Sequence, residues 1–324
     1  MSTKTPFALI DPKRKDAKDS AALLLKRELP KSIGNLERSA NRYVPSEDLL
    51  SAINVALALG MPLLLTGEPG TGKTQVAYYI AHYFGIPKVH VLDVRSTTSA
   101  QDLLYEFDSV AYFHAAHRPQ GDGKELPRWP YVHKKALWLA IEDMAADRPS
   151  VVLIDEVDKA PRDFPNDILG ALDQSAFEVP EWDKPEDLAR QTPYRMQRPQ
   201  GKLPPIVVIT SNSERRLPEA FLRRCIFHQI EFTEELLRKA VESRREEFPG
   251  LDDKTIDAAV RRFMDIRDKL TRKKPATAEF LAWLLVLSVQ GSVTARDVAD
   301  VALFDLPHLC VLVKDRDDLQ DLRR

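Results

Sequence analysis

The sequence predicts an α/β fold in which helices sandwich a parallel β-sheet, followed by a small domain made only of helices. Two observations support this fold class. Up to Phe232, short apolar runs typical of buried strands alternate with helical patterns, and such alternation produces parallel sheets with right-handed crossovers. After Phe232 the strand-like runs cease, and one helical pattern follows another to the end of the chain.

The strands of the sheet are expected where short runs of Val, Ile and Leu end in polar or Gly-rich turns. Apolar runs without alternation are typical of strands covered on both faces, as in the centre of a parallel sheet. Five runs of this kind lie at residues 62–66, 88–94, 151–154, 206–210 and 226–232.

The helices are expected between the strands and after them. Ser46 is a good N-cap residue, and Glu47 and Asp48 follow it in the first turn, where the helix dipole favours acids. A pattern like a capping box at 99–102 predicts the start of a short helix. The longer helices are expected at residues 46–60, 72–84, 133–147, 164–174, 234–247, 253–270, 276–290 and 294–304, and a surface loop at 118–130.

These patterns divide the chain into three parts. Residues 1–41 are polar and are interpreted as an N-terminal arm or extension. Residues 42–232 form the α/β core, and residues 233–324 form a helical lid domain.

Composition narrows the class of protein. The chain has 324 residues, of which 44% are hydrophobic and 30% charged, a balance typical of globular proteins. Its formal net charge of -2 provides no general basic field for nucleic acid or an anionic membrane. Cys225 and Cys310 form no CxxC pair, and no apolar segment has the length of a membrane span. We therefore expect reduced thiols and a cytoplasmic location.

The most specific motif in the chain lies between an expected strand and an expected helix. It matches GxxxxGK[ST], and its residues are Gly67, Glu68, Pro69, Gly70, Thr71, Gly72, Lys73 and Thr74. In such a loop the backbone N–H groups and the following helix N-terminus surround phosphate oxygens. Lys73 is expected to reach the β- and γ-phosphates of ATP, and the Thr74 hydroxyl to bind Mg²⁺. The motif therefore predicts a site for ATP and Mg²⁺.

A pair of acids ends another apolar strand about eighty residues downstream, a separation typical of this architecture. Asp155 and Glu156 follow the run at 151–154, and open α/β sheets bind ligands at the carboxyl ends of their strands. Asp155 is expected to hold Mg²⁺ through water. Glu156 is expected to orient and polarise the water that attacks the γ-phosphate.

Two further features fit hydrolysis of a phosphoanhydride. Asn212 follows the strand at 206–210 and could bond the attacking water or the γ-phosphate from the side opposite Glu156. Arg223 and Arg224 are candidates for an arginine supplied in trans, whose fixed charge matches the charge developing on the transferred phosphoryl group.

Taken together, these motifs resemble the MoxR branch of the AAA+ ATPases. The resemblance depends on the P-loop, on Asp155-Glu156-Val157-Asp158-Lys159-Ala160, on Asn212 and on the segment from Leu217 to Arg224. It covers residues 43–230 well, the helical lid more loosely, and residues 1–41 not at all. It implies an AAA+ core with a helical C-terminal lid, ATP hydrolysis, and rings that are typically hexamers.

The resemblance also implies roles for individual residues. Asn212 corresponds to the sensor-1 residue, and Arg224, or else Arg223, to the arginine finger. Tyr43 and Val44 fall where the family packs the adenine base. Residues 97–128 resemble the helix-2 insert and residues 177–205 the pre-sensor-1 hairpin, two inserts that line the top or the pore of the ring in related proteins.

One position departs from the family pattern. The sensor-2 arginine normally opens a lid helix, but the nearest position here is Ala278. Lys274 or Lys273 could replace it, although an ammonium group lacks the forked donors of a guanidinium group. The alternative interpretation of both lysines is a solvated loop.

The favoured function is ATP-driven remodelling, maturation or activation of a client protein, with a von Willebrand A domain protein as partner. A nucleotide-controlled switch or scaffold in a multi-protein signalling or defence assembly is the alternative. A DNA-acting motor is disfavoured, because acids flank most of the basic segments.

Overall fold

The computed structural model describes residues 36–323, except residues 118–125, 174–175, 189–193 and 292. The chain divides into two compact units. One unit contains Pro45–Glu68 and Lys73–Glu231. The other contains Phe232–Arg324, Pro69–Gly72 and the segment that ends at Val44. The division after Glu231 lies one residue before the predicted end of the core at 232.

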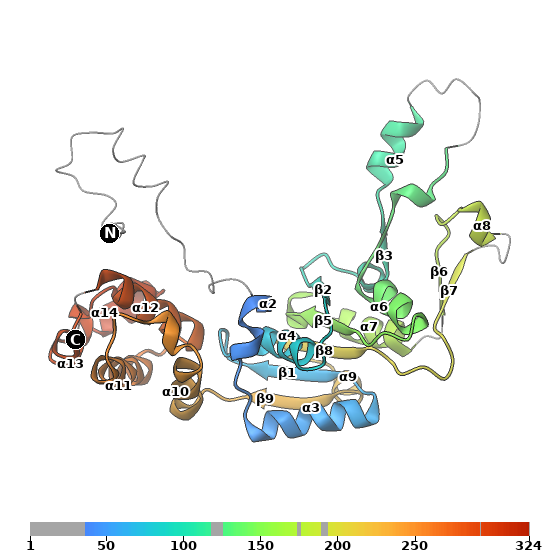
Figure 1. Ribbon diagram of the computed structural model, residues 1–324. Coiled ribbons are helices and arrows are strands. Elements are labelled where there is room, and N and C mark those ends of the chain that lie inside the picture. The colour runs from blue at the N-terminus through green and yellow to red at the C-terminus, as the bar shows by residue number, and fades with distance from the viewer. Residues whose placement is uncertain (1–35, 118–125, 174–175, 189–193, 292, 324) are drawn as a thin grey trace, which may run out of the picture. The chain divides into compact units, whose positions relative to one another are not determined.

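The first unit is built on a five-stranded parallel sheet in the order β2-β5-β8-β1-β9 (Figure 1). All five predicted strands are present, and the α/β fold class is confirmed. Their bounds are β1 Leu63–Gly67, β2 Val89–Asp93, β5 Val151–Asp155, β8 Ile206–Ser211 and β9 Ile226–Ile230.

The three central strands are covered on both faces. Leu64, Ile154 and Ile209 belong to one hydrophobic cluster, and their neighbours along the strands are buried as well. Helix α4 (Lys73–Tyr83) packs on β1, β2, β5 and β8, helix α6 (Ala136–Ala145) on β2 and β5, and helix α3 (Glu47–Leu59) on β1 and β9. The N-cap of α3 is as predicted, since the Ser46 hydroxyl accepts a hydrogen bond from the Leu49 N–H.

Two antiparallel ribbons extend from this sheet (Figure 1). Strands β3 (Tyr105–Phe107) and β4 (Val132–Lys134) form one ribbon, with helix α5 (Ser109–Ala116) between them. Strands β6 (Ala176–Glu178) and β7 (Arg195–Gln197) form the other, with helix α8 (Pro185–Leu188) between them.

The prediction of a helix from residue 133 is wrong at its start. Val132 to Lys134 pair with β3, so the chain is extended there and α6 begins only at Ala136. The remaining short elements of this unit are η2 Ala100–Leu103, η3 Trp129–Tyr131, η4 Val157–Lys159, α7 Phe164–Asp173 and α9 Glu219–Leu222. The capping box predicted at 99–102 opens η2.

The second unit has a core of its own, formed around Phe263, Phe280 and Trp283. Two helices are shorter than predicted, because α10 stops at Glu242 and α13 at Ala299, and 3-10 turns follow both. The elements are α2 Leu36–Ser39, η1 Ala40–Arg42, α10 Glu234–Glu242, η5 Arg245–Glu247, α11 Asp253–Lys269, α12 Thr277–Gln290, α13 Ala295–Ala299, η6 Leu303–Asp305, η7 Leu309–Val311 and α14 Arg316–Asp321. Within the described residues, no helix combines the length and apolar character needed to cross a membrane.

Candidate functional site

The loop between β1 and α4 places Lys73 at the start of a helix, directly after a buried strand. Gly70 and Gly72 have φ angles of 80° and 90°, a left-handed conformation that side chains with a Cβ disfavour. The Lys73 ammonium group donates to the carbonyl oxygens of Gly67 at 2.9 Å and Glu68 at 2.8 Å. The loop therefore curls around its own lysine.

Burial lowers the pKa of Lys73, because desolvation disfavours the charged ammonium group. The nearby carboxylates of Asp155, Asp158, Glu156 and Glu68 act in the opposite direction and favour the charged form. A polyanionic ligand such as a triphosphate would favour the charged form further.

Asp155 ends β5 and lies between two hydroxyl groups. The Thr74 hydroxyl is 2.9 Å from Oδ1, and the Thr210 hydroxyl donates to the same oxygen at 2.5 Å. Burial raises the pKa of Asp155, and the charges of Glu156 and Asp93 add to that effect. The two hydroxyl donors oppose it by stabilising the carboxylate. Within the described part of the chain, the hydrogen bonds to this desolvated carboxylate come from two neutral hydroxyl groups.

Glu156 follows at once and has a left-handed backbone, with φ 61° and ψ 49°. Few residues other than glycine adopt this conformation, and where it occurs the surrounding structure must hold it. The Thr210 hydroxyl accepts a hydrogen bond from the Glu156 N–H at 2.9 Å. The Glu156 carboxylate accepts from the Asn212 amide at 3.2 Å and forms an ion pair with Lys159.

Thr210 was missed as a site residue by the sequence reasoning, which placed it inside an apolar strand. Its hydroxyl donates to Asp155 and accepts from the backbone of Glu156, so one side chain joins both acids. The signal was present, because Thr210 is the first polar residue of an otherwise apolar central strand.

The residues around Asp155 fit a magnesium ion. A hydroxyl group and a carboxylate are hard oxygen ligands, and Mg²⁺ usually takes one or two carboxylates together with substrate phosphates and waters. Thr74 and Asp155 lie side by side and supply these two ligand types. Among the described residues there is no group of three His, Cys, Asp or Glu side chains that could hold a metal, and Mg²⁺ at such a site does not require one.

Predicted site residues of the second unit lie against the tip of the P-loop, which belongs to the same unit. A Cβ added at Gly72 would lie 3.0 Å from the ring of Tyr43, the residue predicted to pack on the adenine. A Cβ added at Gly70 would lie 3.1 Å from Ala276 and 3.6 Å from Ala278. The start of α12 is therefore next to the loop.

The lysines proposed to replace a sensor-2 arginine lie before that helix. Lys273 and Lys274 are both exposed, and the Lys273 N–H donates to the buried Asp318 carboxylate at 2.8 Å. The role of Lys274 in nucleotide binding stays a prediction, and so does that of Val44.

Arg223 and Arg224 lie away from the acids. They directly precede Cys225 and β9, whose first residue pairs with the first residue of β1, so they lie at the amino edge of the sheet. The five residues of β9, at about 3.3 Å each, separate them by about 16 Å from the carboxyl edge, where Asp155 and Glu156 lie. Both arginines are exposed, and Arg223 pairs loosely with Glu219.

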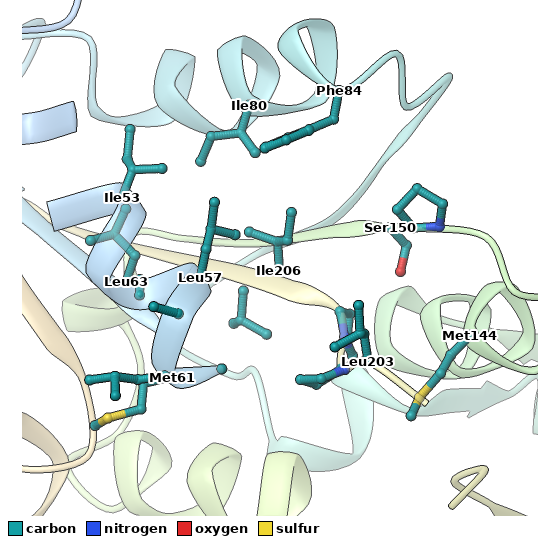
Figure 2. Close-up of a pocket in the computed structure, with 18 of the residues that line it drawn as sticks. Ile53, Leu57, Met61, Leu63, Ile80, Phe84, Met144, Ser150, Leu203 and Ile206 are labelled. Atoms are coloured by element: carbon teal, nitrogen blue, oxygen red, sulfur yellow. The ribbon is translucent and has the colours of Figure 1, made fainter. Parts of the chain in front are cut away.

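A cavity of about 750 Å³ opens at that amino edge (Figure 2). Its apolar wall includes Leu57, Ile80 and Met144. Ser150, directly before β5, and Ile206, the first residue of β8, also line it. The cavity is therefore at the end of the sheet opposite the acids and plays no part in their chemistry.

The match to a family model agrees with the geometry of the site. The family model described as AAA domain (dynein-related subfamily) matches residues 62–225, which include the P-loop, both acids, Asn212 and both candidate arginines. A crystal structure of a candidate ATPase from Cytophaga hutchinsonii ATCC 33406 is 13% identical in sequence, with a TM-score of 0.36. The matched region covers 89% of the present chain and 83% of the chain in that structure.

A crystal structure of NtrX from Brucella abortus in complex with ADP is 15% identical, also with a TM-score of 0.36. The matched region covers 87% of the present chain and 54% of the NtrX chain, so the present chain spans about half the length of that protein. TM-scores this low add nothing to the argument from the family model and the site.

Proposed function

The chain belongs to the dynein-related subfamily of AAA domains, and from this membership we propose that it is a Mg²⁺-dependent ATPase of the MoxR type. Its hydrolysis of ATP would remodel, mature or activate a client protein. The observation that carries the proposal is the linked arrangement of Thr74, Asp155, Thr210, Glu156 and Asn212, which joins the P-loop to the acids and the acids to the neighbouring strand.

ATP would be held mainly through its phosphates. The left-handed conformation of Gly70 and Gly72 would allow the N–H groups of the loop to face the phosphates, and Lys73 would exchange its two carbonyl partners for the β- and γ-phosphates. Thr74 and Asp155 would hold Mg²⁺, which supplies positive charge to the phosphate oxygens when bound.

Glu156 would act on the attacking water. Its carboxylate, fixed by the left-handed backbone, is positioned by the Asn212 amide and accepts a proton more readily than an amide side chain would. Lys159 would have to release the second carboxylate oxygen, or share it, for the water to bind there.

An arginine finger from a neighbouring copy would complete the site. Arg224 is separated from the acids of its own chain by the length of β9, so it cannot stabilise their transition state in cis. A ring with a repeated head-to-tail interface would place it next to the pocket of the adjacent subunit. A homo-hexamer is the proposed ring, following the MoxR resemblance.

Client engagement is proposed for the ribbons. No residue of helix α5 is fully buried, and the side chains of Val110 and Phe113 are 65% and 59% exposed. Exposed apolar side chains at the tip of a ribbon are suited to contact with another protein. A von Willebrand A domain protein is the proposed partner that would deliver the client.

The Glu156→Gln variant tests the function. The amide keeps the shape of the side chain but cannot polarise water, so we expect ATP affinity within about threefold of the unchanged protein and phosphate release lower by at least about 100-fold. Nucleotide titration and a phosphate-release assay measure both. Wild-type turnover would show that another residue positions the water.

The same variant tests the remodelling part of the proposal. An ATP-bound, non-hydrolysing form should retain a client that Lys73→Ala, which cannot bind ATP, does not retain. Equal recovery of partners by Glu156→Gln and Lys73→Ala in affinity purification would argue against nucleotide-dependent client binding.

A further inference from the structure

The turn that carries Glu156 also holds the neighbouring strand end. Asp158 lies in η4, two residues after Glu156, and is 3% exposed. Its Oδ1 accepts a hydrogen bond from the Asn212 N–H at 3.2 Å, and its Oδ2 accepts one from the Glu214 N–H at 2.9 Å. One carboxylate therefore fixes two backbone groups of the loop that follows β8.

This loop has a conformation that needs support. Ser213 has φ 60°, in the left-handed region that a residue with a Cβ disfavours. The Ser213 N–H donates to the Ser211 hydroxyl at 3.0 Å. Arg215 donates to the carbonyl oxygen of Ala160 at 3.2 Å, which ties the loop a second time to the segment after η4.

The fixed backbone decides where the Asn212 side chain can reach. Its amide donates to Glu156 Oε1, so Glu156 is contacted by a residue that its own turn holds in place through Asp158. Positioning errors of about 1 Å in a catalytic contact can cost about 100-fold in rate. Release of the Asn212 N–H should therefore affect the chemical step more than ATP binding.

We propose that Asp158 is a positioning residue that sets the Asn212 amide against Glu156 for ATP hydrolysis. The inference rests on the proposed ATPase function and adds to it a residue that does not itself touch the nucleotide. Its carboxylate is suited to the task because it accepts at both oxygens, whereas an amide accepts at only one and would turn an NH₂ group towards a backbone N–H.

The decisive variant is Asp158→Asn, which keeps the volume of the side chain and loses one of the two bonds. We expect kcat to fall by about 10–100-fold while the affinity for a fluorescent ATP analogue stays within about threefold. Amide hydrogen exchange in the peptide covering residues 206–216 should become faster. Asp163→Asn, the same change at an exposed acid five residues along the chain, is the matched control and should alter none of these quantities.

A double-mutant cycle separates positioning from a general structural role. If Asp158 acts through Asn212, Asp158→Asn should slow turnover no further in an Asn212→Ala background, because coupled residues are not additive. Three outcomes would each overturn the proposal. The losses of kcat could multiply in the double variant, or kcat of Asp158→Asn alone could stay within twofold of wild type. Asp158→Asn could also lose nucleotide affinity and thermal stability as strongly as it loses kcat.

Failure of the ATPase function itself would look different. Wild type and Asp163→Asn would then both release phosphate no faster than Lys73→Ala. In that case Asp158 has no role in hydrolysis and the proposal is wrong. The amide hydrogen exchange of residues 206–216 would still show whether Asp158 holds the loop after β8.

Discussion

Thr210 satisfies both of its hydrogen-bonding capacities within the site. Its hydroxyl group donates to Asp155 and accepts from the Glu156 N–H, so rotation of the side chain would break both hydrogen bonds. It links a buried carboxylate with a raised pKa to a residue with a left-handed backbone. At this scale the site is a set of mutually dependent contacts, and changes of a few atoms should have measurable effects.

Thr210→Val removes the hydroxyl but keeps the branched shape. We expect kcat to fall by about tenfold or more, because Glu156 loses the acceptor that holds its backbone. Thr210→Ser retains the hydroxyl and should restore most of the rate, which steady-state phosphate release can measure. A full rate in Thr210→Val would show that Glu156 needs no such support.

Lys73→Ala should abolish ATP binding, because it removes the point charge placed to contact both the β- and γ-phosphates. Isothermal titration with ATP and Mg²⁺ measures the effect. Normal affinity would mean that the nucleotide binds elsewhere.

Asp155→Asn should raise the thermal stability of the protein in the absence of nucleotide and metal. The folded-state pKa of Asp155 is raised, so the carboxyl group stabilises the fold in its protonated form at low pH. That contribution is lost as the pH rises through the folded pKa, and an uncharged amide avoids the loss. We expect a melting temperature higher by about 1–3 °C at pH 7, and a smaller difference from wild type as the pH falls. A difference that grows on acidification would have the wrong sign.

At the scale of elements, the sequence predicted the parts whose signal is local. The five strands and the P-loop are short contiguous patterns, and every predicted strand bound lies within two residues of the bound in the structure. The ribbons were harder to predict, because β3, β4, β6 and β7 have three residues each and are defined by distant partners. His133 and Lys134 have no strong strand signal of their own, and pairing with β3 overrides their helical context.

The predictability of the site follows the same rule. Lys73, Thr74, Asp155 and Glu156 belong to contiguous motifs and could be named from the sequence. Asn212 was also named, but its contact with Glu156, like that of Thr210, depends on β8 lying beside β5 in the sheet. That adjacency follows from the strand order, which no local pattern encodes.

The β6–β7 ribbon is held to α6 by aromatic side chains. Trp182 lies 5.2 Å from Trp138 between ring centroids, and Tyr194 is stacked on Trp138 at 6.0 Å. Trp182→Ala should therefore lower the free energy of unfolding by about 2–4 kcal/mol, as measured by urea titration. The ring partners of Trp182, which are Trp129, Trp138 and Tyr194, lie outside the P-loop. ATP affinity should therefore stay unchanged, and a parallel loss of affinity would contradict this expectation.

At the scale of the whole molecule, the placement of Arg224 predicts that the active unit contains more than one copy. Mixing Arg224→Ala subunits, which keep an intact pocket, with Lys73→Ala subunits, which keep an intact finger, should recover part of the ATPase activity that each lacks alone. Repeating the mixture with Arg223→Ala decides which arginine acts. No recovery in rings shown to contain both variants would mean that neither arginine acts across the interface.

The order of strands in the sheet also has a consequence for synthesis of the protein. β8 lies between β5 and β1, yet it leaves the ribosome more than fifty residues after β5 and well over a hundred after β1. Until then both earlier strands present an unpaired inner edge, which is the kind of surface that chaperones protect and that aggregation exploits. When β8 inserts, the nascent chain gains a continuous sheet from β2 to β1, and Glu156 gains its contacts with Thr210 and Asn212 in the same step. ATP can therefore stabilise this protein only late in its translation.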